Sequence, residues 1–249
     1  MSAHQLLVVI PARGGSKGIP GKNIKPLGDV PLLGWTADAI CRSRGADRTT
    51  VILSTDDEEI ARVGRDFFLD VPFLRPSDLS TDEAGSVDVA IHALDWLEQN
   101  RGLNFKAVML LQPTSPFRSP EQIEEAIALM QRSDATAIVG VERLYRSMSM
   151  LYQCDDVGVL LPLTSGQDTR TRRQDIEPIY TPNGAMYLVC TAALRRERTF
   201  VPAGSRVQIM DRISGIDIDD QADWDIAEAI ARAGQTWRGE IGERTTSPR

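Results

Sequence analysis

The chain has 249 residues, of which 42% are hydrophobic and 25% are charged, and this composition excludes an intrinsically disordered protein. The longest apolar runs, such as Leu6–Ile10, are far shorter than the ~20 residues that cross a bilayer, so we expect no transmembrane helix. The N-terminus has neither the basic segment nor the long apolar run of a secretory signal, which predicts a cytoplasmic protein.

The net charge of −7 argues against a nucleic acid as partner, because surfaces that bind phosphate backbones are usually basic. The charge is unevenly distributed, since residues 1–28 contain no acidic side chain but contain Arg13, Lys17, Lys22 and Lys25. This segment is therefore expected to face an anion. The three cysteines fit neither a disulfide framework nor a zinc site, and we expect buried thiols at Cys41, Cys154 and Cys190.

Apolar, strand-like runs alternate with amphipathic helical windows along most of the chain, and this alternation predicts an α/β domain with a largely parallel sheet. The expected strands are Leu6–Ile10, Thr50–Ser54, Ala107–Gln112, Ala135–Val141 and Gly184–Cys190. The expected helices are Pro31–Arg42, Asp57–Arg65, Ser86–Gln99, Pro120–Arg132 and Asp220–Ala233. Because the strand-to-helix turns of such a sheet open on one edge, motifs placed there converge on one crevice.

The alternation is interrupted between Arg143 and Pro182, where large apolar residues are mixed with a polar stretch. This segment has too many large apolar side chains for a solvated linker, so we expect a small inserted subdomain or dimerisation arm over residues 143–182. The core domain is expected to consist of residues 1–142 and 183–233. Residues 234–249 are polar and are expected to form a frayed tail.

A glycine-rich and basic segment, Pro11–Asn23, directly follows the first expected strand. Its four glycines let the backbone approach an anion closely, and its cationic side chains can neutralise that anion. It is not a Walker A loop, because Ser16 stands where that pattern requires glycine and Asn23 where it requires serine or threonine. Neither Gly14 nor Gly15 begins a dinucleotide fingerprint. A flexible surface loop is the alternative, but the preceding strand favours a triphosphate site.

Two carboxylates occur in an extended segment shortly before the last expected helix. Because side chains alternate along an extended chain, Asp217 and Asp219 are expected on one face, with Ile216 and Ile218 towards the core. Such a pair repels unless a cation lies between its members, and carboxylate oxygens are suitable ligands for Mg²⁺. The alternative is that these acids only cap the following helix, and we keep that interpretation for Asp220.

Two further segments follow expected strands. Ser54–Glu59 is interpreted first as a helix start, with a capping residue and acids in the first turn. Leu111–Arg118 contains two prolines and predicts a stiff loop, in which Gln112 either contacts a ligand or only shapes a turn. The sequence has no nucleophile elbow and no zinc-type histidine pair. Together the motifs favour phosphoryl or nucleotidyl transfer, in which catalysis is mostly positioning and charge neutralisation.

The segment Ile10–Asn23 resembles the N-terminal signature of the CMP-sialic acid synthetases, also called N-acylneuraminate cytidylyltransferases. The likeness spans about residues 6 to 230, and its specificity comes from the ordered set of blocks rather than from any single one. The other matching blocks are Arg75-Pro76 with Leu79-Ser80 and Ser86–Val89, then Leu110–Pro116, then Arg173-Gln174 with Tyr180 and Asn183–Tyr187, and finally Ile216–Asp219.

This resemblance implies a Rossmann-like, three-layer nucleotidyltransferase fold with a mixed, mostly parallel sheet and a small inserted dimerisation subdomain, in a homodimer. It also implies the reaction. The anomeric hydroxyl of a nine-carbon 2-keto sugar acid, N-acetylneuraminate or a related nonulosonate, would attack the α-phosphorus of CTP. The products would be the CMP-sugar and pyrophosphate, and Mg²⁺ would be the cofactor.

The same resemblance assigns roles to individual residues. The triphosphate would be held by Arg13, Ser16, Lys22 and Asn23, and Lys22 would also offset charge on the α-phosphate in the transition state. The cytosine would be contacted by Arg75 and Ser86. The sugar pocket would be lined by Gln112, Arg173, Gln174 and Tyr187, since a guanidinium suits the sugar carboxylate. Mg²⁺ would be bound by Asp217 and Asp219, and Asp217 or a metal-bound water would activate the sugar hydroxyl.

Two departures from the family pattern concern the sugar rather than the nucleotide. Glu142–Leu151 lacks a lysine that many relatives have there. The family usually has a proline closely after an Arg-Gln-Asp sequence, whereas here Ile176 and Glu177 intervene before Pro178. Legionaminate and pseudaminate therefore stay open as acceptors. The eight-carbon acid Kdo is a further alternative, although that group has a shorter loop ending in Arg-Leu-Pro. A catalytically silent nucleotide-binding protein is the third hypothesis, but retention of Lys22 with both carboxylates argues against it.

Overall fold

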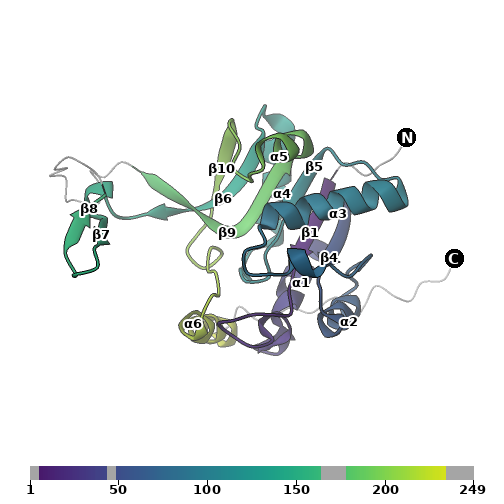
Figure 1. The fold of residues 1–249 in the computed structure, drawn as a ribbon, viewed down its shortest axis with the longest axis horizontal. Helices are drawn as coiled ribbons and strands as arrows, with labels where there is room; N and C mark the ends of the chain where they lie inside the picture. The colour runs from purple at the N-terminus through teal and green to yellow at the C-terminus, as the bar shows by residue number, and fades with distance from the viewer. Residues whose placement is uncertain (1–5, 44–48, 164–177, 234–249) are drawn as a thin grey trace.

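The computed structural model describes residues 6–43, 49–163 and 178–233, and the structural statements below concern these residues (Figure 1). A six-stranded sheet lies at the centre, in the order β10-β6-β9-β5-β1-β4. Its strands are β1 (Leu6–Pro11), β4 (Thr49–Ser54), β5 (Ala107–Leu110), β6 (Ala137–Leu144), β9 (Ile179–Cys190) and β10 (Ser205–Ile209). Three neighbouring pairs are parallel, and β9 is antiparallel to both β5 and β6. The expected mixed, mostly parallel sheet is confirmed.

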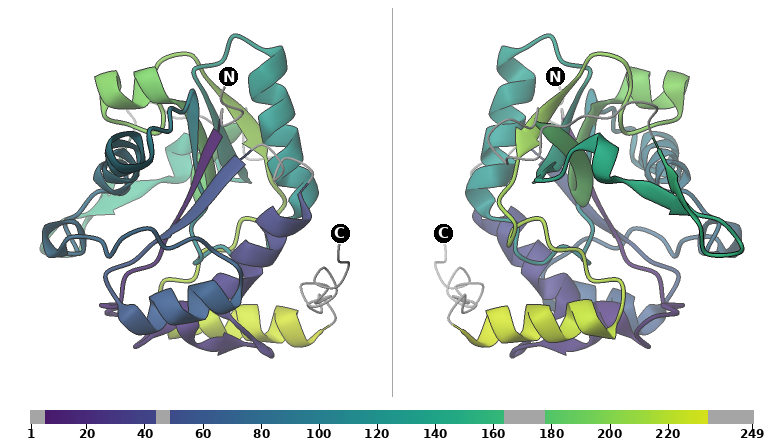
Figure 2. Two further views of the ribbon diagram at one scale, coloured as in Figure 1. Left: turned by 90° about the vertical axis from the view of Figure 1, so that its right-hand side faces the viewer. Right: turned by 90° about the vertical axis from the view of Figure 1, so that its left-hand side faces the viewer.

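Helices cover both faces of this sheet, which makes the fold a three-layer one (Figure 2). On one face lie α1 (Leu32–Arg42), α2 (Glu58–Asp66) and α4 (Pro120–Arg132), and on the other lie α3 (Ser86–Arg101) and α5 (Thr191–Glu197). Val8 and Ile10 pack on the first face while Leu7 and Val9 pack on the second. This two-sided burial explains why the strand is an unbroken apolar run rather than an alternating one.

The last helix, α6 (Gln221–Arg232), closes a third cluster at the carboxyl edge of the sheet. Trp224 of α6 packs there with Leu27, Ile218 and other buried residues. Asp220 caps α6 by accepting hydrogen bonds from the backbone N–H groups of Ala222 and Asp223, as expected. This cluster fixes the chain that bears the two predicted metal ligands.

The short elements fill the connections. They are η1 (Lys22–Ile24), β2 (Pro26–Leu27), β3 (Val30–Pro31), η3 (Ser77–Leu79) and η4 (Met148–Met150). The sequence patterns did not predict β10 or α5. Five-residue β10 is an edge strand with several exposed side chains, and seven-residue α5 is too short for a clear helical period.

An arm projects from the sheet where β6 and β9 continue as a paired ribbon as far as Leu144 and Ile179 (Figure 1). Beyond the ribbon, β7 (Tyr152–Cys154) and β8 (Leu160–Pro162) form a hairpin away from the main sheet. This arm occupies the described part of the expected insertion, 143–182. Residues 164–177 and the expected tail lie outside the described residues, and the assignment of the insertion as a subdomain stays a prediction.

The expectation of buried thiols is wrong. Cys41 and Cys154 are exposed, Cys190 is intermediate, and all three are free. Cys41 follows the last buried residue of α1, Ile40, on the solvent side of the helix, and every residue of β7 is exposed. Among the described helices, none has the length and hydropathy needed to cross a membrane.

Candidate active site

A cleft of about 390 Å³ lies at the carboxyl ends of β1 and β5. Its walls come from the loop after β1, the loop before α3, the loop after β5 and the segment before α6. This is the edge at which strand-to-helix turns of a parallel sheet converge. The cleft brings together the predicted residues Arg13, Ser16, Lys22, Asn23, Arg75, Ser86, Gln112, Asp217 and Asp219.

The loop after β1 is folded by its own polar side chains. Asn23 is buried, and its Nδ2 donates a hydrogen bond to the carbonyl oxygen of Arg13 at 2.9 Å, which ties the two ends of the loop together. Gly18 packs so closely on the acidic segment that a Cβ there would lie 2.4 Å from the carbonyl oxygen of Asp219. Only glycine therefore allows the basic loop and the acidic segment to meet at this point.

The side chain of Lys22 also connects the basic loop to the acidic segment. Its Nζ donates a hydrogen bond to the carbonyl oxygen of Ile218 at 2.5 Å. Ile218 is the residue between Asp217 and Asp219, so this bond brings the ammonium to the acidic segment. The positive charge of Lys22 also acts to lower the pKa of Asp217. A cation from one end of the chain is thus fixed against the carboxylate pair from the other end.

The acidic pair has the alternation predicted from the sequence. Ile218 is fully buried, and its N–H donates to the carbonyl oxygen of Thr114 at 2.8 Å, while Asp217 and Asp219 on either side both line the cleft. Burial raises the pKa of Asp217, and the charge of Asp219 adds to this shift. A hydrogen bond from Thr114 and the charge of Lys22 oppose it.

The donor set of this pair fits a magnesium ion shared with phosphate. Oδ1 of Asp217 is buried and has no hydrogen-bond partner among the described residues. No cluster of three or more His, Cys, Asp or Glu side chains in the described ranges could hold a metal alone. Mg²⁺ usually takes one or two protein carboxylates and completes its shell with phosphate oxygens and water, so two carboxylates beside a phosphate loop are sufficient.

Two of the four cations of the N-terminal segment pair with a carboxylate of the chain itself. Nη2 of Arg13 lies 2.6 Å from Oδ1 of Asp82, and the ammonium of Lys17 contacts the other oxygen of the same carboxylate. Hydrogen bonds from Lys17 and Arg13 hold the pKa of Asp82 below its ordinary value. Nothing in the sequence distinguishes Asp82 from the other acids before α3, and its role was not predicted.

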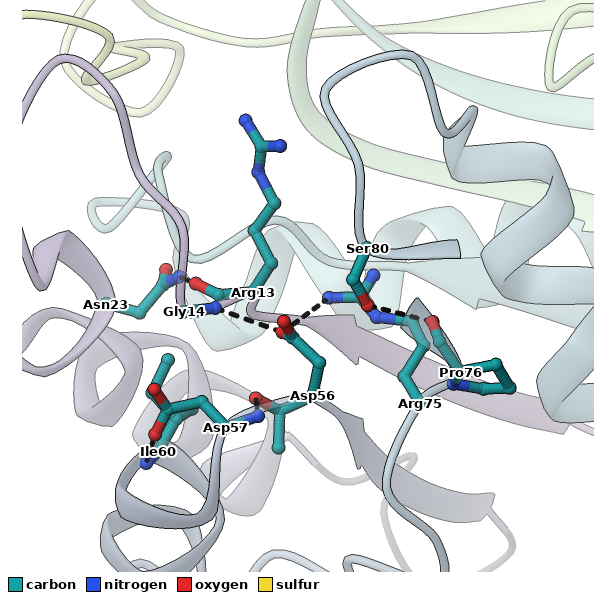
Figure 3. Close-up of polar contacts among 10 residues, drawn as sticks. Arg13, Gly14, Asn23, Asp56, Asp57, Ile60, Arg75, Pro76 and Ser80 are labelled. Atoms are coloured by element: carbon teal, nitrogen blue, oxygen red, sulfur yellow. Dashed lines mark hydrogen bonds and ion pairs between the residues drawn. The ribbon is translucent and has the colours of Figure 1, made fainter. Parts of the chain in front are cut away.

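Arg75 and Ser86 form the other end of the cleft. Arg75 is buried, and its Nε and Nη2 have no hydrogen-bond partner among the described residues (Figure 3). Burial lowers the pKa of this guanidinium and the charge of Arg13 adds to the effect, whereas the carboxylate of Asp56 opposes it. Ser86 is the first residue of α3, where helix N–H groups are unpaired. Buried donors without partners indicate a polar ligand at this end.

The predicted sugar residues are only partly brought together. Gln112 lines the cleft, and its Oε1 lies 3.0 Å from the position of a Cβ on Gly184. Tyr187 does not line the cleft; its ring packs on Phe200 with centroids 5.3 Å apart, and burial raises its pKa. Its sugar contact stays a prediction. The remaining two, Arg173 and Gln174, lie outside the described residues.

A buried arginine behind the cleft was not predicted. Arg118 donates from Nε to the carbonyl oxygen of Ala185 and from Nη1 to Oγ1 of Thr36, both at 2.8 Å, and from Nη2 to the carbonyl oxygen of Gln112. Burial lowers the pKa of its guanidinium, while the charge of Asp217 opposes that shift. The only signal in the sequence was a charge placed directly after the buried Pro116-Phe117 pair.

Comparisons with known proteins identify the family of the chain. The model of the family described as Cytidylyltransferase matches residues 7–225. The CMP-N,N'-diacetyllegionaminic acid synthase of Legionella pneumophila is 33% identical over 232 residues, which cover 93% of this chain and 98% of that protein. The N-acylneuraminate cytidylyltransferase of Escherichia coli O18:K1:H7 is 33% identical over 91% of this chain, but the match spans only 52% of its length.

Other relatives and structures extend the comparison. An N-acylneuraminate cytidylyltransferase of Streptococcus agalactiae is 31% identical over 88% of this chain, and again the match spans about half of that protein, 51%. A solved CMP:2-keto-3-deoxy-manno-octonic acid synthetase complexed with CTP superposes with a TM-score of 0.66 over 92% of this chain and 99% of that one. Its sequence is 13% identical, so it supports the fold alone. The chain belongs to the cytidylyltransferase family, within the group that includes the CMP-sialic acid synthetases.

Proposed function

We propose that this chain transfers CMP from CTP to a nonulosonic acid, N-acetylneuraminate or a related nine-carbon acid, and releases pyrophosphate. One observation carries the proposal: the basic loop after β1 and the carboxylate pair before α6 face one cleft and are joined by the bond from Lys22 to Ile218. A triphosphate needs cations around its oxygens, and a metal beside it needs carboxylates. A protein that only bound nucleotide would not need the second feature.

Different residues of the cleft would contact different parts of the nucleotide. Arg13, Ser16, Lys22 and Asn23 would hold the triphosphate, with Lys22 also stabilising the charge that develops on the α-phosphate. At the other end, the free donors of Arg75 and the N-terminal turn of α3 at Ser86 would contact the cytosine. This order leaves the α-phosphate near the acidic pair.

Asp217 and Asp219 would hold Mg²⁺, which supplies charge neutralisation for the phosphates when it is bound. The sugar hydroxyl forms a bond to the α-phosphorus, the bond from that phosphorus to the β-phosphate oxygen breaks, and pyrophosphate leaves. The hydroxyl proton is lost as the new bond forms, and Asp217, whose side chain lines the cleft, is the candidate acceptor among the residues of this chain. Gln112, with Arg173 and Gln174, would orient the sugar acid.

The arm is proposed to form a homodimer in a cytoplasmic enzyme. Its hairpin exposes large apolar side chains, among which Val157 is 84% and Leu160 is 64% exposed. Several exposed large apolar side chains on one short hairpin are typical of a protein contact. A second copy of the chain is the partner that family resemblance suggests.

The test is pyrophosphate release from CTP and Mg²⁺ with a panel of acids: N-acetylneuraminate, N,N'-diacetyllegionaminate, pseudaminate and Kdo. We expect release with a nine-carbon acid and none when Mg²⁺ is left out. Release with Kdo alone would change the acceptor but keep the chemistry. CTP binding without release for any acid would contradict the enzyme proposal and favour a silent nucleotide-binding protein.

A further inference from the structure

We infer that Asp56 is a positioning residue that couples the triphosphate loop to the guanidinium of Arg75 and so contributes to the choice of nucleobase. The inference rests on the proposed function, because it assigns the base-contacting role to Arg75. It concerns a carboxylate that the motifs singled out only as part of a helix start. Figure 3 shows Asp56 between Gly14 on one side and Arg75 on the other.

The backbone places Asp56 at a junction of three segments. β1 and β4 are parallel neighbours, so their carboxyl ends meet, and the N–H of Ala12 donates to the carbonyl oxygen of Ser54 at 2.9 Å. On the other side, the N–H of Arg75 donates to the carbonyl oxygen of Thr55 at 2.7 Å. The residue that follows Ser54 and Thr55 is therefore held between the phosphate loop and the Arg75 loop.

The side chain of Asp56 uses one oxygen for both neighbours. Oδ1 accepts a hydrogen bond from the N–H of Gly14 at 3.0 Å, and the same atom lies 3.8 Å from Nη2 of Arg75. The second distance is too long for a hydrogen bond but short enough for strong attraction at a site where the Arg75 side chain is only 4% exposed. The carboxylate thus balances the charge of Arg75, while Nε and Nη2 keep no hydrogen-bond partner among the described residues and can donate to a ligand.

The negative charge of Asp56 is needed because the rest of the environment disfavours the charged form of Arg75. Burial disfavours the charged guanidinium, and the cation of Arg13 repels it, while Asp56 attracts it. Without the carboxylate, Arg75 would turn towards solvent, and its donors would no longer be held at the base. The N–H of Gly14 would lose its acceptor at the same time, so the two ends of the nucleotide site would be disturbed together.

The next residue provides a matched control. Asp57 carries the same charge, but its Oδ1 accepts from the N–H groups of Glu59 at 2.8 Å and Ile60 at 3.0 Å, which caps α2. Asparagine is an equally good helix cap, so Asp57→Asn removes one negative charge near the loop without changing the contacts of Asp56. Asp56→Asn keeps an acceptor for Gly14 and removes only the charge that faces Arg75.

The test compares CTP and UTP in wild type, Asp56→Asn and Asp57→Asn. For Asp56→Asn we expect KM for CTP to rise roughly tenfold with kcat within about twofold, and the preference for CTP over UTP to fall. Asp57→Asn should match wild type in KM, kcat and preference. Asp56→Ala, which also removes the acceptor for Gly14, should be weaker still. An Asp56→Asn variant with unchanged KM and unchanged preference would overturn the inference.

Binding measurements separate this inference from the proposed function. Calorimetry with CTP and UTP, without any acid, reports the same preference as a ratio of Kd values. If no acid releases pyrophosphate but Asp56→Asn narrows the Kd ratio, the enzyme proposal fails and the positioning role stands. If wild type releases pyrophosphate while Asp56→Asn keeps the wild-type ratio, the enzyme proposal stands and the positioning role fails.

Discussion

At the scale of single residues, Lys22 is central to the cleft, because its ammonium connects two segments that lie 196 residues apart in the chain. Replacement by alanine should lower kcat by ~10²-fold or more and weaken CTP binding much less, since the contact would be strongest in the transition state. Steady-state kinetics together with calorimetric CTP binding measures both effects. A rise in KM with kcat unchanged would reduce Lys22 to a binding residue.

The carboxylate pair makes a second prediction at this scale. Asp217→Asn and Asp219→Asn should each lower turnover by orders of magnitude, because an amide is a poor ligand for Mg²⁺. Folding should stay intact, since both side chains face the cleft rather than the core. Circular dichroism gives the folding control, and turnover near wild type in both variants would refute the metal role.

Asp217 also makes stability depend on pH. Its folded pKa is raised, mainly by burial, so its contribution to stability is present below the ordinary pKa of an aspartate and is lost as the pH rises through the raised value. Asp217→Asn cannot titrate and keeps no such dependence at this position. In Mg²⁺-free buffer, the Tm of Asp217→Asn relative to wild type should therefore increase between about pH 4 and about pH 7. A constant difference in Tm across this range would contradict the shift.

At the scale of elements, Arg118 ties three of them together: α1 through Thr36, the loop after β5 through Gln112, and β9 through Ala185. Arg118→Met would leave these acceptors without a donor and should lower the free energy of unfolding by about 2–4 kcal/mol. At ~2–4 °C per kcal/mol, Tm should fall by roughly 5–15 °C.

A surface arginine provides the control for this change. Arg101 pairs with Asp70 but is 38% exposed, so Arg101→Met should cost less than about 1 kcal/mol. Thermal unfolding of both variants checks the contrast. Similar losses of Tm in the two would show that the buried network of Arg118 adds no special stability.

The sequence predicted most elements, because strands covered on both faces are continuous apolar runs and amphipathic helices have a clear period. The ends of α4 were predicted at Pro120 and Arg132. At the first of these ends, Ser119 and Gln122 form a capping box. The edge strand β10 has no such signal in its sequence, because most of its side chains are exposed and its place in the sheet depends on pairing with β6.

The residues that line the cleft could be predicted from local patterns, whereas the residues that support them could not. Lys22, Asp217 and Asp219 belong to short patterns that are expected for phosphate and metal chemistry, so their types and spacing are visible locally, and all three line the cleft. The partner of Gly14, Asp56, lies 42 residues away, and the partner of Arg118 at Ala185 lies 67 residues away. Such pairings depend on strand order and register, which no local pattern contains.

At the scale of the whole molecule, the hairpin at the end of the arm bears exposed apolar side chains and projects away from the main sheet (Figure 1). If a second copy covers the hairpin, replacing Leu160 and Leu161 with glutamate should convert a dimer into a monomer. Both side chains are exposed, so the fold should persist. Gln99→Glu adds charge to an exposed polar position of α3, outside the arm, and is the control. Light scattering gives the mass, and a wild type that is already monomeric would refute the proposed homodimer.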